Sequence, residues 1–277
     1  MLRLRNTITF LFSALIMSCS TDLPRPAEDP ASRATIDPPN EPTPSVKTVR
    51  QYNYRVVRTL PHDPTAFTQG LVVHNGQFVE STGQNGRSSI RIVDMNTGKV
   101  VKRQSLEAMY FGEGMVVLGT NAYMLTWLNQ QGFVFDMKTL KQKGSFRYSG
   151  EGWGLTSDGT YLYMSNGSNT INVLDPKDFS VVRTIHVTLN GSPQNQLNEL
   201  EWIKGEIWAN VWRTDTIVRI DPITGTIVGI VNMQGLLPAA ERQYDTDVLN
   251  GIAYDAQSKS LYVTGKNWPH VYEIVIE

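Results

Sequence analysis

Short apolar runs recur along residues 71–276, and polar residues that favour turns bound each of them. The clearest runs are rich in β-branched residues and occupy positions 71–73, 89–93, 170–174, 216–220 and 271–276. No long segment has apolar residues at the 3.6-residue spacing of an amphipathic helix. The pattern therefore predicts an all-β domain.

An aspartate begins a similar turn after several of these runs. The turns are Asp94-Met95-Asn96-Thr97-Gly98, Asp136-Met137-Lys138-Thr139-Leu140, Asp175-Pro176-Lys177-Asp178-Phe179 and Asp221-Pro222-Ile223-Thr224-Gly225. An aspartate in this place accepts hydrogen bonds from the amides of its own turn. The recurrence indicates a repeated structural unit.

A second set of motifs opens each unit. The motifs are Gln69-Gly70-Leu71, Glu113-Gly114-Met115, Trp153-Gly154-Leu155, Glu199-Leu200-Glu201 and Asn250-Gly251-Ile252, with central positions 44, 40, 46 and 51 residues apart. These lengths fit four-stranded blades, so we predict a five-bladed β-propeller. The fifth unit has too few strands, and we expect segment 52–60 to complete it and close the ring. An open two-sheet sandwich is the alternative, but it does not explain five units in register.

The N-terminal 18 residues have the pattern of a cleaved signal peptide. Arg3 and Arg5 precede an apolar run at 7–17, which is too short to cross a hydrocarbon core of about 30 Å. Leu15-Ile16-Met17-Ser18 before Cys19 resembles a bacterial lipobox, which implies cleavage before Cys19 and acylation of its thiol. The alternative is an ordinary signal peptide with a chance cysteine.

The composition changes twice along the chain. Seven of the 14 prolines lie between Pro24 and Pro44, and we predict that residues 19–46 form a disordered tether. Residues 47–277 then form the propeller domain. With the anchor at Cys19, the protein is expected to lie in the cell envelope and face the periplasm, and Ser20 favours the outer membrane over the inner one.

The net charge, the few cysteines and histidines, and the absence of a nucleophile motif argue against several functions. The chain has 25 basic and 26 acidic residues and a net charge of −1, so no nucleic-acid partner is expected. It has one cysteine and four histidines without the spacing of a zinc site. There is no GxSxG motif, and no histidine lies beside a nucleophile, which argues against a hydrolase.

Two sets of residues should meet at one end of the propeller. One set opens the first strand of each unit, and the other follows the next strand: Glu80-Ser81-Thr82-Gly83, Leu125-Thr126-Trp127, Ser165-Asn166-Gly167, Asn210-Val211-Trp212 and Thr264-Gly265-Lys266. Together they suggest an aromatic pocket with a few polar groups, which is typical of a small-ligand site. Trp127, Trp153 and Trp212 could instead pack between blades, and we assign Trp202 and Trp208 to packing.

Glu113 is the clearest candidate for acid–base chemistry. It stands between Gly112 and Gly114, which we interpret as allowing a ligand to approach the backbone. In an apolar mouth its carboxylate would have a raised pKa. The alternative is a solvated loop glutamate.

Ten strings resemble, in order, the plant and bacterial type of glutaminyl-peptide cyclotransferase, also called glutamine cyclotransferase. They are Phe67-Thr68-Gln69-Gly70-Leu71, Glu80-Ser81-Thr82-Gly83, Phe111-Gly112-Glu113-Gly114, Leu125-Thr126-Trp127, Gly152-Trp153-Gly154-Leu155, Ser157-Asp158-Gly159, Asn198-Glu199-Leu200-Glu201-Trp202, Ala209-Asn210-Val211-Trp212, Leu249-Asn250-Gly251-Ile252-Ala253 and Thr264-Gly265-Lys266. They span the whole predicted domain, and the family is itself a five-bladed propeller.

The resemblance implies conversion of an N-terminal glutamine on a peptide or protein to pyroglutamate, with release of ammonia. It makes Glu113 the catalytic proton carrier. It also makes Phe67, Phe111, Trp127, Trp153 and Trp212 the walls of the site, and Gln69, Asn198 and Lys266 its hydrogen-bonding groups. The scheme needs no metal or other cofactor, although a structural cation in the channel stays open. We expect a monomer that meets the membrane only through its lipid.

Two departures from the family concern the choice of substrate. Gln84-Asn85-Gly86-Arg87 stands where the family commonly has an aromatic residue, and Leu128 stands where a lysine is frequent. The main rival to an enzyme is a non-catalytic propeller that scaffolds partners or binds peptides in the envelope.

Overall fold

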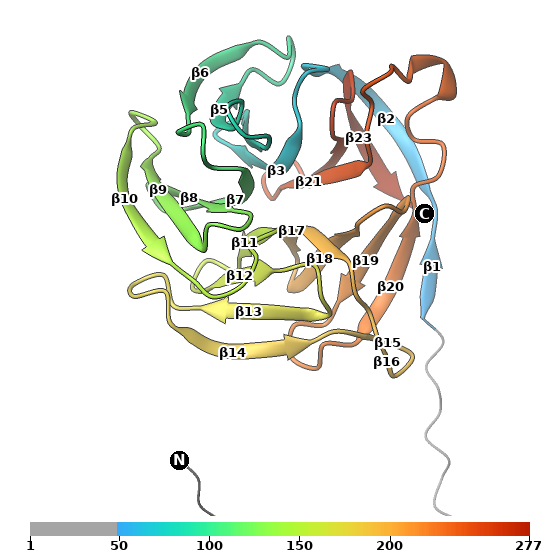
Figure 1. The fold of residues 1–277 in the computed structure, drawn as a ribbon. Coiled ribbons are helices and arrows are strands. Elements are labelled where there is room, and N and C mark those ends of the chain that lie inside the picture. Colours follow the sequence, from blue (N-terminus) through green and yellow to red (C-terminus); the bar gives the residue numbers. More distant parts are fainter. Residues whose placement is uncertain (1–48) are drawn as a thin grey trace, which may run out of the picture. The chain divides into compact units, whose positions relative to one another are not determined.

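The computed structural model describes residues 49–277, and nearly every element in this part of the chain is a strand. Five sheets of four or five strands are arranged radially around one axis, and this part of the chain also contains one two-stranded sheet and one short 3-10 turn, η1 (Ala239–Glu241) (Figure 1). The prediction of a five-bladed β-propeller is confirmed. No element of residues 49–277 is a helix long and apolar enough to cross a membrane. The predicted signal peptide (1–18), Cys19 and the tether (19–46) lie outside the described residues and stay predictions.

The first three blades follow one another along the chain. Blade 1 contains β3 (Thr68–His74), β4 (Gln77–Thr82), β5 (Ser89–Val93) and β6 (Val100–Ser105). Blade 2 contains β7 (Gly112–Leu118), β8 (Asn121–Thr126), β9 (Gln131–Asp136) and β10 (Gln142–Arg147). Blade 3 contains β11 (Leu155–Ser157), β12 (Leu162–Ser165), β13 (Thr170–Leu174) and β14 (Val181–His186). Consecutive strands are antiparallel, and the first strand of each blade lies nearest the axis (Figure 1).

The last two blades take up the N-terminal strands as well. Blade 4 contains β17 (Leu197–Ile203), β18 (Glu206–Val211), β19 (Thr216–Ile220), β20 (Ile227–Asn232) and, as a fifth strand, β1 (Arg50–Tyr52). Blade 5 contains β21 (Leu249–Asp255), β22 (Ser260–Gly265), β23 (His270–Ile276) and β2 (Tyr54–Pro61). A two-stranded hairpin of β15 (Thr188–Leu189) and β16 (Ser192–Pro193) lies between blades 3 and 4 in the chain.

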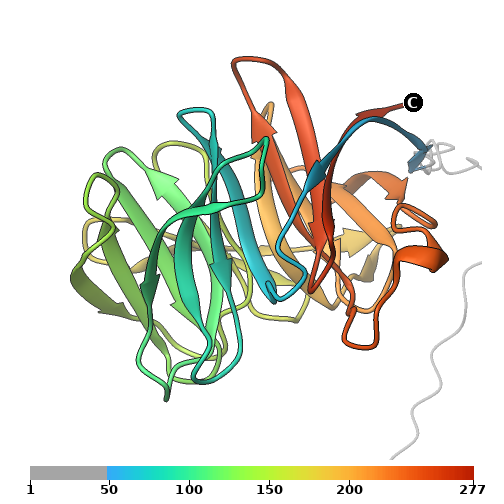
Figure 2. The same ribbon diagram turned by 90° about the horizontal axis from the view of Figure 1, so that it is seen from above.

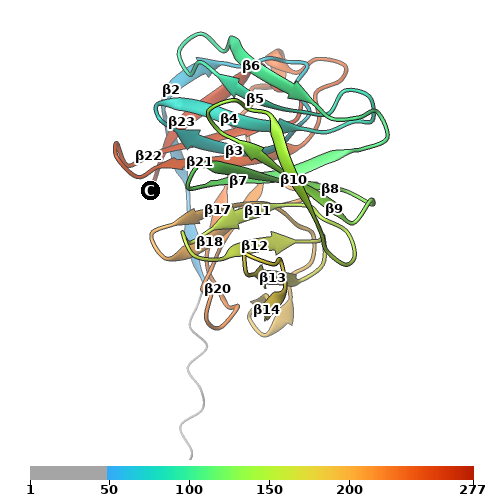
Figure 3. The same ribbon diagram turned by 90° about the vertical axis from the view of Figure 1, so that its left-hand side faces the viewer.

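Closure of the ring by an N-terminal strand is confirmed, but the segment 52–60 is not one strand. β2 pairs antiparallel with β23, as expected. Asn53 interrupts the strand and exchanges backbone hydrogen bonds with Glu277. Ahead of it, β1 runs parallel to β20 and covers the outer edge of blade 4 (Figures 1 and 3). Tyr52 therefore belongs to blade 4, because an unpaired outer edge there offers its backbone groups to the passing chain.

The aspartate turns have the hydrogen bonds that their sequence predicts. In each turn an Oδ1 atom accepts from a backbone N–H two or three residues later: Thr97 to Asp94 at 2.9 Å, Thr139 to Asp136 at 2.8 Å, Lys177 to Asp175 at 2.9 Å and Ile223 to Asp221 at 2.7 Å. Each turn connects the third and fourth strands of a blade. The same local chemistry thus sets the same corner in blades 1 to 4.

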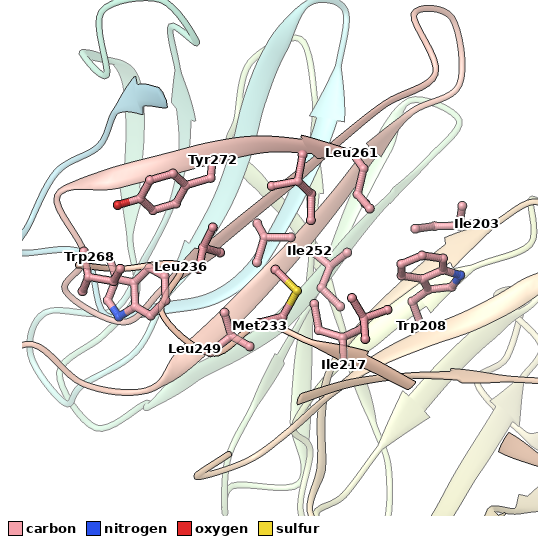
Figure 4. Close-up of a cluster of buried hydrophobic side chains, with 14 residues drawn as sticks. Ile203, Trp208, Ile217, Met233, Leu236, Leu249, Ile252, Leu261, Trp268 and Tyr272 are labelled. Carbon is pink, nitrogen blue, oxygen red and sulfur yellow. The ribbon is translucent and has the colours of Figure 1, made fainter. Parts of the chain in front are cut away.

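Seen at a right angle to Figure 1, neighbouring blades stand side by side (Figure 2). Apolar side chains fill the five spaces between neighbouring blades. The largest of these clusters lies between blades 4 and 5, where Trp208 and Ile217 meet Ile252 and Tyr272, with Met233 from the following loop (Figure 4). Each blade therefore buries both of its faces, unlike the sheets of a sandwich, which each have one solvated face. This arrangement excludes the two-sheet alternative.

Two buried carboxylates of β17 join the innermost strands near the axis. Glu199 accepts backbone N–H bonds from Ile252 at 2.8 Å and Leu71 at 3.4 Å, and Glu201 accepts one from Tyr254 at 2.9 Å. Burial raises the pKa of both carboxyl groups, that of Glu201 to about 8, and the charge of Glu201 raises the pKa of Glu199 further. Blade 4 is thereby bonded to blades 1 and 5 through side chains.

We expect Glu201→Gln to flatten the pH dependence of folding stability. A carboxyl group whose pKa rises from 4.5 unfolded to about 8 folded stabilises the fold most at low pH, and this stabilisation is lost as pH rises toward 8. The melting temperature of the wild type should therefore fall relative to that of the variant between about pH 3.5 and about pH 9, values that lie about one unit outside this window on either side. Thermal unfolding across this range measures the difference. A constant gap between the two curves would contradict the assignment.

Candidate active site

All nine residues that the sequence predicts for the site line a single pocket of about 390 Å³. They are Phe67, Gln69, Phe111, Glu113, Trp127, Trp153, Asn198, Trp212 and Lys266. They come from all five blades, and they lie where the innermost strands begin and the second strands end. Cys19, the predicted lipidation site, lies outside the described residues.

β-bulges present one polar residue from each of three innermost strands to the pocket, and in blade 4 this residue is Asn198 rather than the predicted Glu199, which does not line the pocket. In blade 1 the register passes from Thr68 opposite Thr82 to Gly70 opposite Ser81, which leaves Gln69 without a partner across the strand pair. β7 and β17 have the same irregularity, at Glu113 and at Asn198 respectively. A bulge bends its strand and redirects a side chain, so the repeated bulge accounts for the convergence of these residues.

The second set is fixed by backbone hydrogen bonds to the neighbouring innermost strand. Trp127, Trp212 and Lys266 directly follow β8, β18 and β22. Their backbone N–H groups donate to Phe111 at 2.9 Å, to Gln196 at 2.8 Å and to Val248 at 2.9 Å, respectively. Each side chain is therefore placed at the pocket by its own blade.

Five aromatic rings form the walls in two separate series. Phe67 meets Phe111 with ring centres 6.0 Å apart, and Phe111 meets Trp127 at 5.7 Å. Trp153 meets Trp212 edge to face at 5.3 Å. Trp127 is 38% exposed, which distinguishes it from a packing residue, whereas Trp202 and Trp208 pack elsewhere, on Tyr163 and within the cluster between blades 4 and 5.

Glu113 is a buried carboxylate that faces the pocket. It is 5% exposed, and its carboxylate has no hydrogen-bond partner among residues 49–277. Burial raises its pKa well above the ordinary value; the Lys266 ammonium opposes this rise and the Glu151 carboxylate adds to it. Burial likewise lowers the pKa of Lys266, although Glu113 and Asp247 partly restore it. The solvated-loop interpretation of Glu113 is therefore wrong.

The two amides of the site differ in what they offer a ligand. Asn250 donates to Oε1 of Gln69 at 3.3 Å and to the carbonyl of Thr68 at 2.9 Å. Since its oxygen is occupied, Gln69 presents its NH₂ group to the pocket. Asn198 is buried, and within residues 49–277 its Oδ1 has no partner. A buried acceptor without a partner indicates a place for a donor on a ligand.

The glycines beside Glu113 have a different role from the one we expected. A Cβ on Gly114 would lie 2.5 Å from the carbonyl oxygen of Trp153, and one on Gly112 would lie 2.4 Å from the side chain of Met124. They permit close packing of protein atoms rather than the approach of a ligand. The Gly114 N–H donates to Trp153 at 2.6 Å, so this contact also bonds blade 2 to blade 3.

Sequence reasoning missed four residues of this region. Arg213, Asp247 and Val248 line the pocket, and Glu151 lies behind two of its tryptophans. Arg213 directly follows Trp212, and Asp247-Val248 precede the motif that opens the fifth unit, so their positions in the repeat contained the signal. Glu151 had no such signal, because it lies in the variable link between two units.

No group of three or more histidine, cysteine, aspartate or glutamate side chains is arranged to hold a metal ion within residues 49–277. The polar lining of the pocket consists of two carboxylates, Glu113 and Asp247, two basic side chains, Lys266 and Arg213, and two amides, beside three indoles. Such a set can hold and move a proton and can bind a polar group of a small ligand.

The fold and the pocket define the class of protein: a five-bladed β-propeller with a pocket lined by aromatic residues at one end of its axis. The family model for glutamine cyclotransferase matches residues 31–276. The chain belongs to the glutamine cyclotransferase family, which confirms the resemblance found in the sequence.

Individual relatives agree with this assignment. The chain is 42% identical over 228 residues to glutaminyl-peptide cyclotransferase of Arabidopsis thaliana, a match that covers 80% of this chain and 71% of that protein. Its structure resembles the crystal structure of Myxococcus xanthus glutaminyl cyclase with a TM-score of 0.78 and 34% identity, over 83% of this chain and 98% of the other.

Proposed function

We propose that the protein is a glutaminyl-peptide cyclotransferase, which converts the N-terminal glutamine of a peptide or protein to pyroglutamate and releases ammonia. The observation that carries this proposal is Glu113, a buried carboxylate without a hydrogen-bond partner in residues 49–277, facing an aromatic pocket beside Lys266. Membership of the family supports it.

The reaction takes place within one residue of the substrate. The α-nitrogen attacks the carbon of the side-chain carboxamide, a new C–N bond forms, and the bond to the carboxamide nitrogen breaks. Because nucleophile and electrophile are already connected, the site mainly has to hold a curled conformer. The aromatic walls suit this task, since they enclose a small volume and exclude water.

Glu113 moves the proton that this reaction requires. Its carboxylate takes a proton from the attacking nitrogen and delivers it to the leaving nitrogen, so that ammonia departs rather than an amide ion. The raised pKa of Glu113 makes its carboxylate a stronger base than an exposed glutamate. Activity should therefore increase as pH rises through the pKa of Glu113.

The remaining polar groups bind the substrate. The NH₂ of Gln69 and the ammonium of Lys266 are donors for the carboxamide oxygen and the charge that develops on it. Asn198 lines the pocket, and we propose that its amide forms hydrogen bonds with the substrate. Arg213 and Asp247 also line the pocket, and we propose that they contact the residues that follow the N-terminal glutamine.

The scheme uses only groups of this chain and of the substrate, so we propose that it runs without a metal or other cofactor. We also propose that the protein works as a monomer in the cell envelope, anchored by lipid on Cys19 and facing the periplasm, with Ser20 favouring the outer membrane over the inner one. The lipobox resemblance supports this location.

A single assay separates the enzyme from the scaffold. We expect purified protein to remove ammonia from a peptide that begins with glutamine, as followed by mass spectrometry. The same peptide with an acetylated N-terminus should not react, because its nitrogen is no longer a nucleophile. Absence of ammonia loss across several glutamine peptides, from a folded sample, would favour a non-catalytic scaffold or peptide-binding protein.

A further inference from the structure

Glu151 connects two tryptophans of the pocket wall that belong to different blades. Its Oε2 accepts a hydrogen bond from Trp127 Nε1 at 2.6 Å and another from Trp153 Nε1 at 2.9 Å. Trp127 follows β8 in blade 2, whereas Trp153 precedes β11 in blade 3. Glu151 lies between β10 and β11, in the link from one blade to the next.

This contact lies at the break between the two series of rings, on the side where blade 2 meets blade 3. One series of rings runs from Phe67 through Phe111 to Trp127, and the other from Trp153 to Trp212. The two series are joined at Trp127 and Trp153 through the Glu151 carboxylate. A charged acceptor forms stronger hydrogen bonds than a neutral one, so it can fix two large rings that contact different neighbours.

The same carboxylate acts on Glu113. The charged or titratable groups that influence Glu113 come from two directions: Lys266 from blade 5, which favours its ionised form, and Glu151 from the link before blade 3, which disfavours it. Tyr148 also lies within reach of the Glu113 charge, but burial raises its pKa to about 12, so it stays neutral.

We propose that Glu151 is a positioning residue of the site, which holds Trp127 and Trp153 as one wall and sets the electrostatic environment of Glu113. The expected effect of Glu151 on turnover rests on the proposed cyclotransferase function. The geometric part of the role, which is the positioning of the two indoles, does not depend on that function.

Two variants separate the two parts of the role. Glu151→Gln keeps an oxygen that can accept both indole N–H groups but removes the charge, whereas Glu151→Ala removes both. Without the negative charge, the pKa of Glu113 falls, so the acidic limb of the kcat/KM profile should move to lower pH in both variants. Only Glu151→Ala should also lower kcat/KM on the plateau, by about 10- to 100-fold, because a wall that shifts by about 1 Å misplaces the substrate.

Glu107→Gln is the matched control, since Glu107 is exposed and lies in another loop. It should leave both the limb and the plateau unchanged. If Glu151→Ala has the same pH profile and the same plateau kcat/KM as the wild type, the proposal is overturned. Equal plateau losses in the two Glu151 variants with an unmoved limb would reduce Glu151 to a structural residue and also overturn it.

Near-UV circular dichroism provides a readout that needs no substrate. We expect Glu151→Ala to change the tryptophan signal of the folded protein and Glu151→Gln to retain it. If the wild type cyclises no peptide while these spectra differ as expected, the proposed function fails and the geometric part stands. Identical tryptophan spectra in Glu151→Ala and wild type would remove the geometric part.

Discussion

Glu113→Gln is expected to lower turnover of a glutamine peptide by about 10²- to 10⁴-fold while leaving the propeller folded. An amide of the same shape cannot take a proton from the attacking nitrogen and return it to the leaving one. The fold should not suffer, because the carboxylate has no hydrogen-bond partner within residues 49–277 and a neutral group is easier to bury. Single-turnover kinetics with the peptide and a thermal melt measure the two effects.

Glu199→Gln is the matched control for this variant. Glu199 is also a buried carboxylate of raised pKa near the axis, but it bonds backbone N–H groups and does not line the pocket. It should therefore keep its turnover. Near-normal turnover in Glu113→Gln would remove Glu113 from the mechanism. If Glu199→Gln loses as much turnover as Glu113→Gln, the loss comes from replacing a buried carboxylate near the axis and not from the loss of a proton carrier.

Glu80→Gln is expected to destabilise the fold by about 3–5 kcal/mol, the usual result of breaking a buried ion pair. Glu80 is fully buried and accepts hydrogen bonds from His62 at 3.0 Å, Thr68 at 2.6 Å and Arg91 at 2.8 Å. Burial opposes its ionisation, but the charges of Arg91 and His62 and these hydrogen bonds hold the pKa of Glu80 below its ordinary value. The variant leaves Arg91 buried without its main counter-charge.

The measurement is the melting temperature, which should fall by on the order of 10 °C for a domain of this size. Glu206→Gln is the control, because Glu206 pairs with Arg219 at 2.7 Å in a half-buried position. Its loss should cost less than about 1 kcal/mol. If the melting temperatures of the two variants fall by similar amounts, the buried Glu80–Arg91 pair does not contribute more to stability than a half-buried ion pair.

The sequence was sufficient for the ring, because the blades repeat, and with the family resemblance it identified nine of the twelve residues that line the pocket. The blade length brings Gln69 and Glu113 to the same place in their blades, where a bulge turns each of them inward. In the fourth unit the sequence register was wrong by one residue: it selected Glu199, whereas the bulge makes Asn198 the equivalent residue, which only the family resemblance had indicated. Residues at equivalent positions of successive blades lie at the same end of the propeller axis. Their convergence can therefore be predicted from the repeat, without knowledge of contacts between distant segments.

Features outside the repeat could not be predicted from the sequence. Glu151 lies in a link of variable length, and its partners are defined only once blades 2 and 3 are side by side. The glycines beside Glu113 were misinterpreted because a close approach of Trp153 or Met124 leaves no trace in local sequence. The division of the segment 52–60 between two blades likewise depends on which sheet edge is unoccupied.

That division has a kinetic consequence. β1 and β2 are the first strands of the described chain to be synthesised, yet their partners β20 and β23 are among the last. Until the final residues appear, two strands and the edges of two blades stay unpaired, and such long-range pairing is slow and prone to aggregation. Ring closure is therefore expected to be the rate-limiting event of folding, and it can occur only after the whole domain has been made.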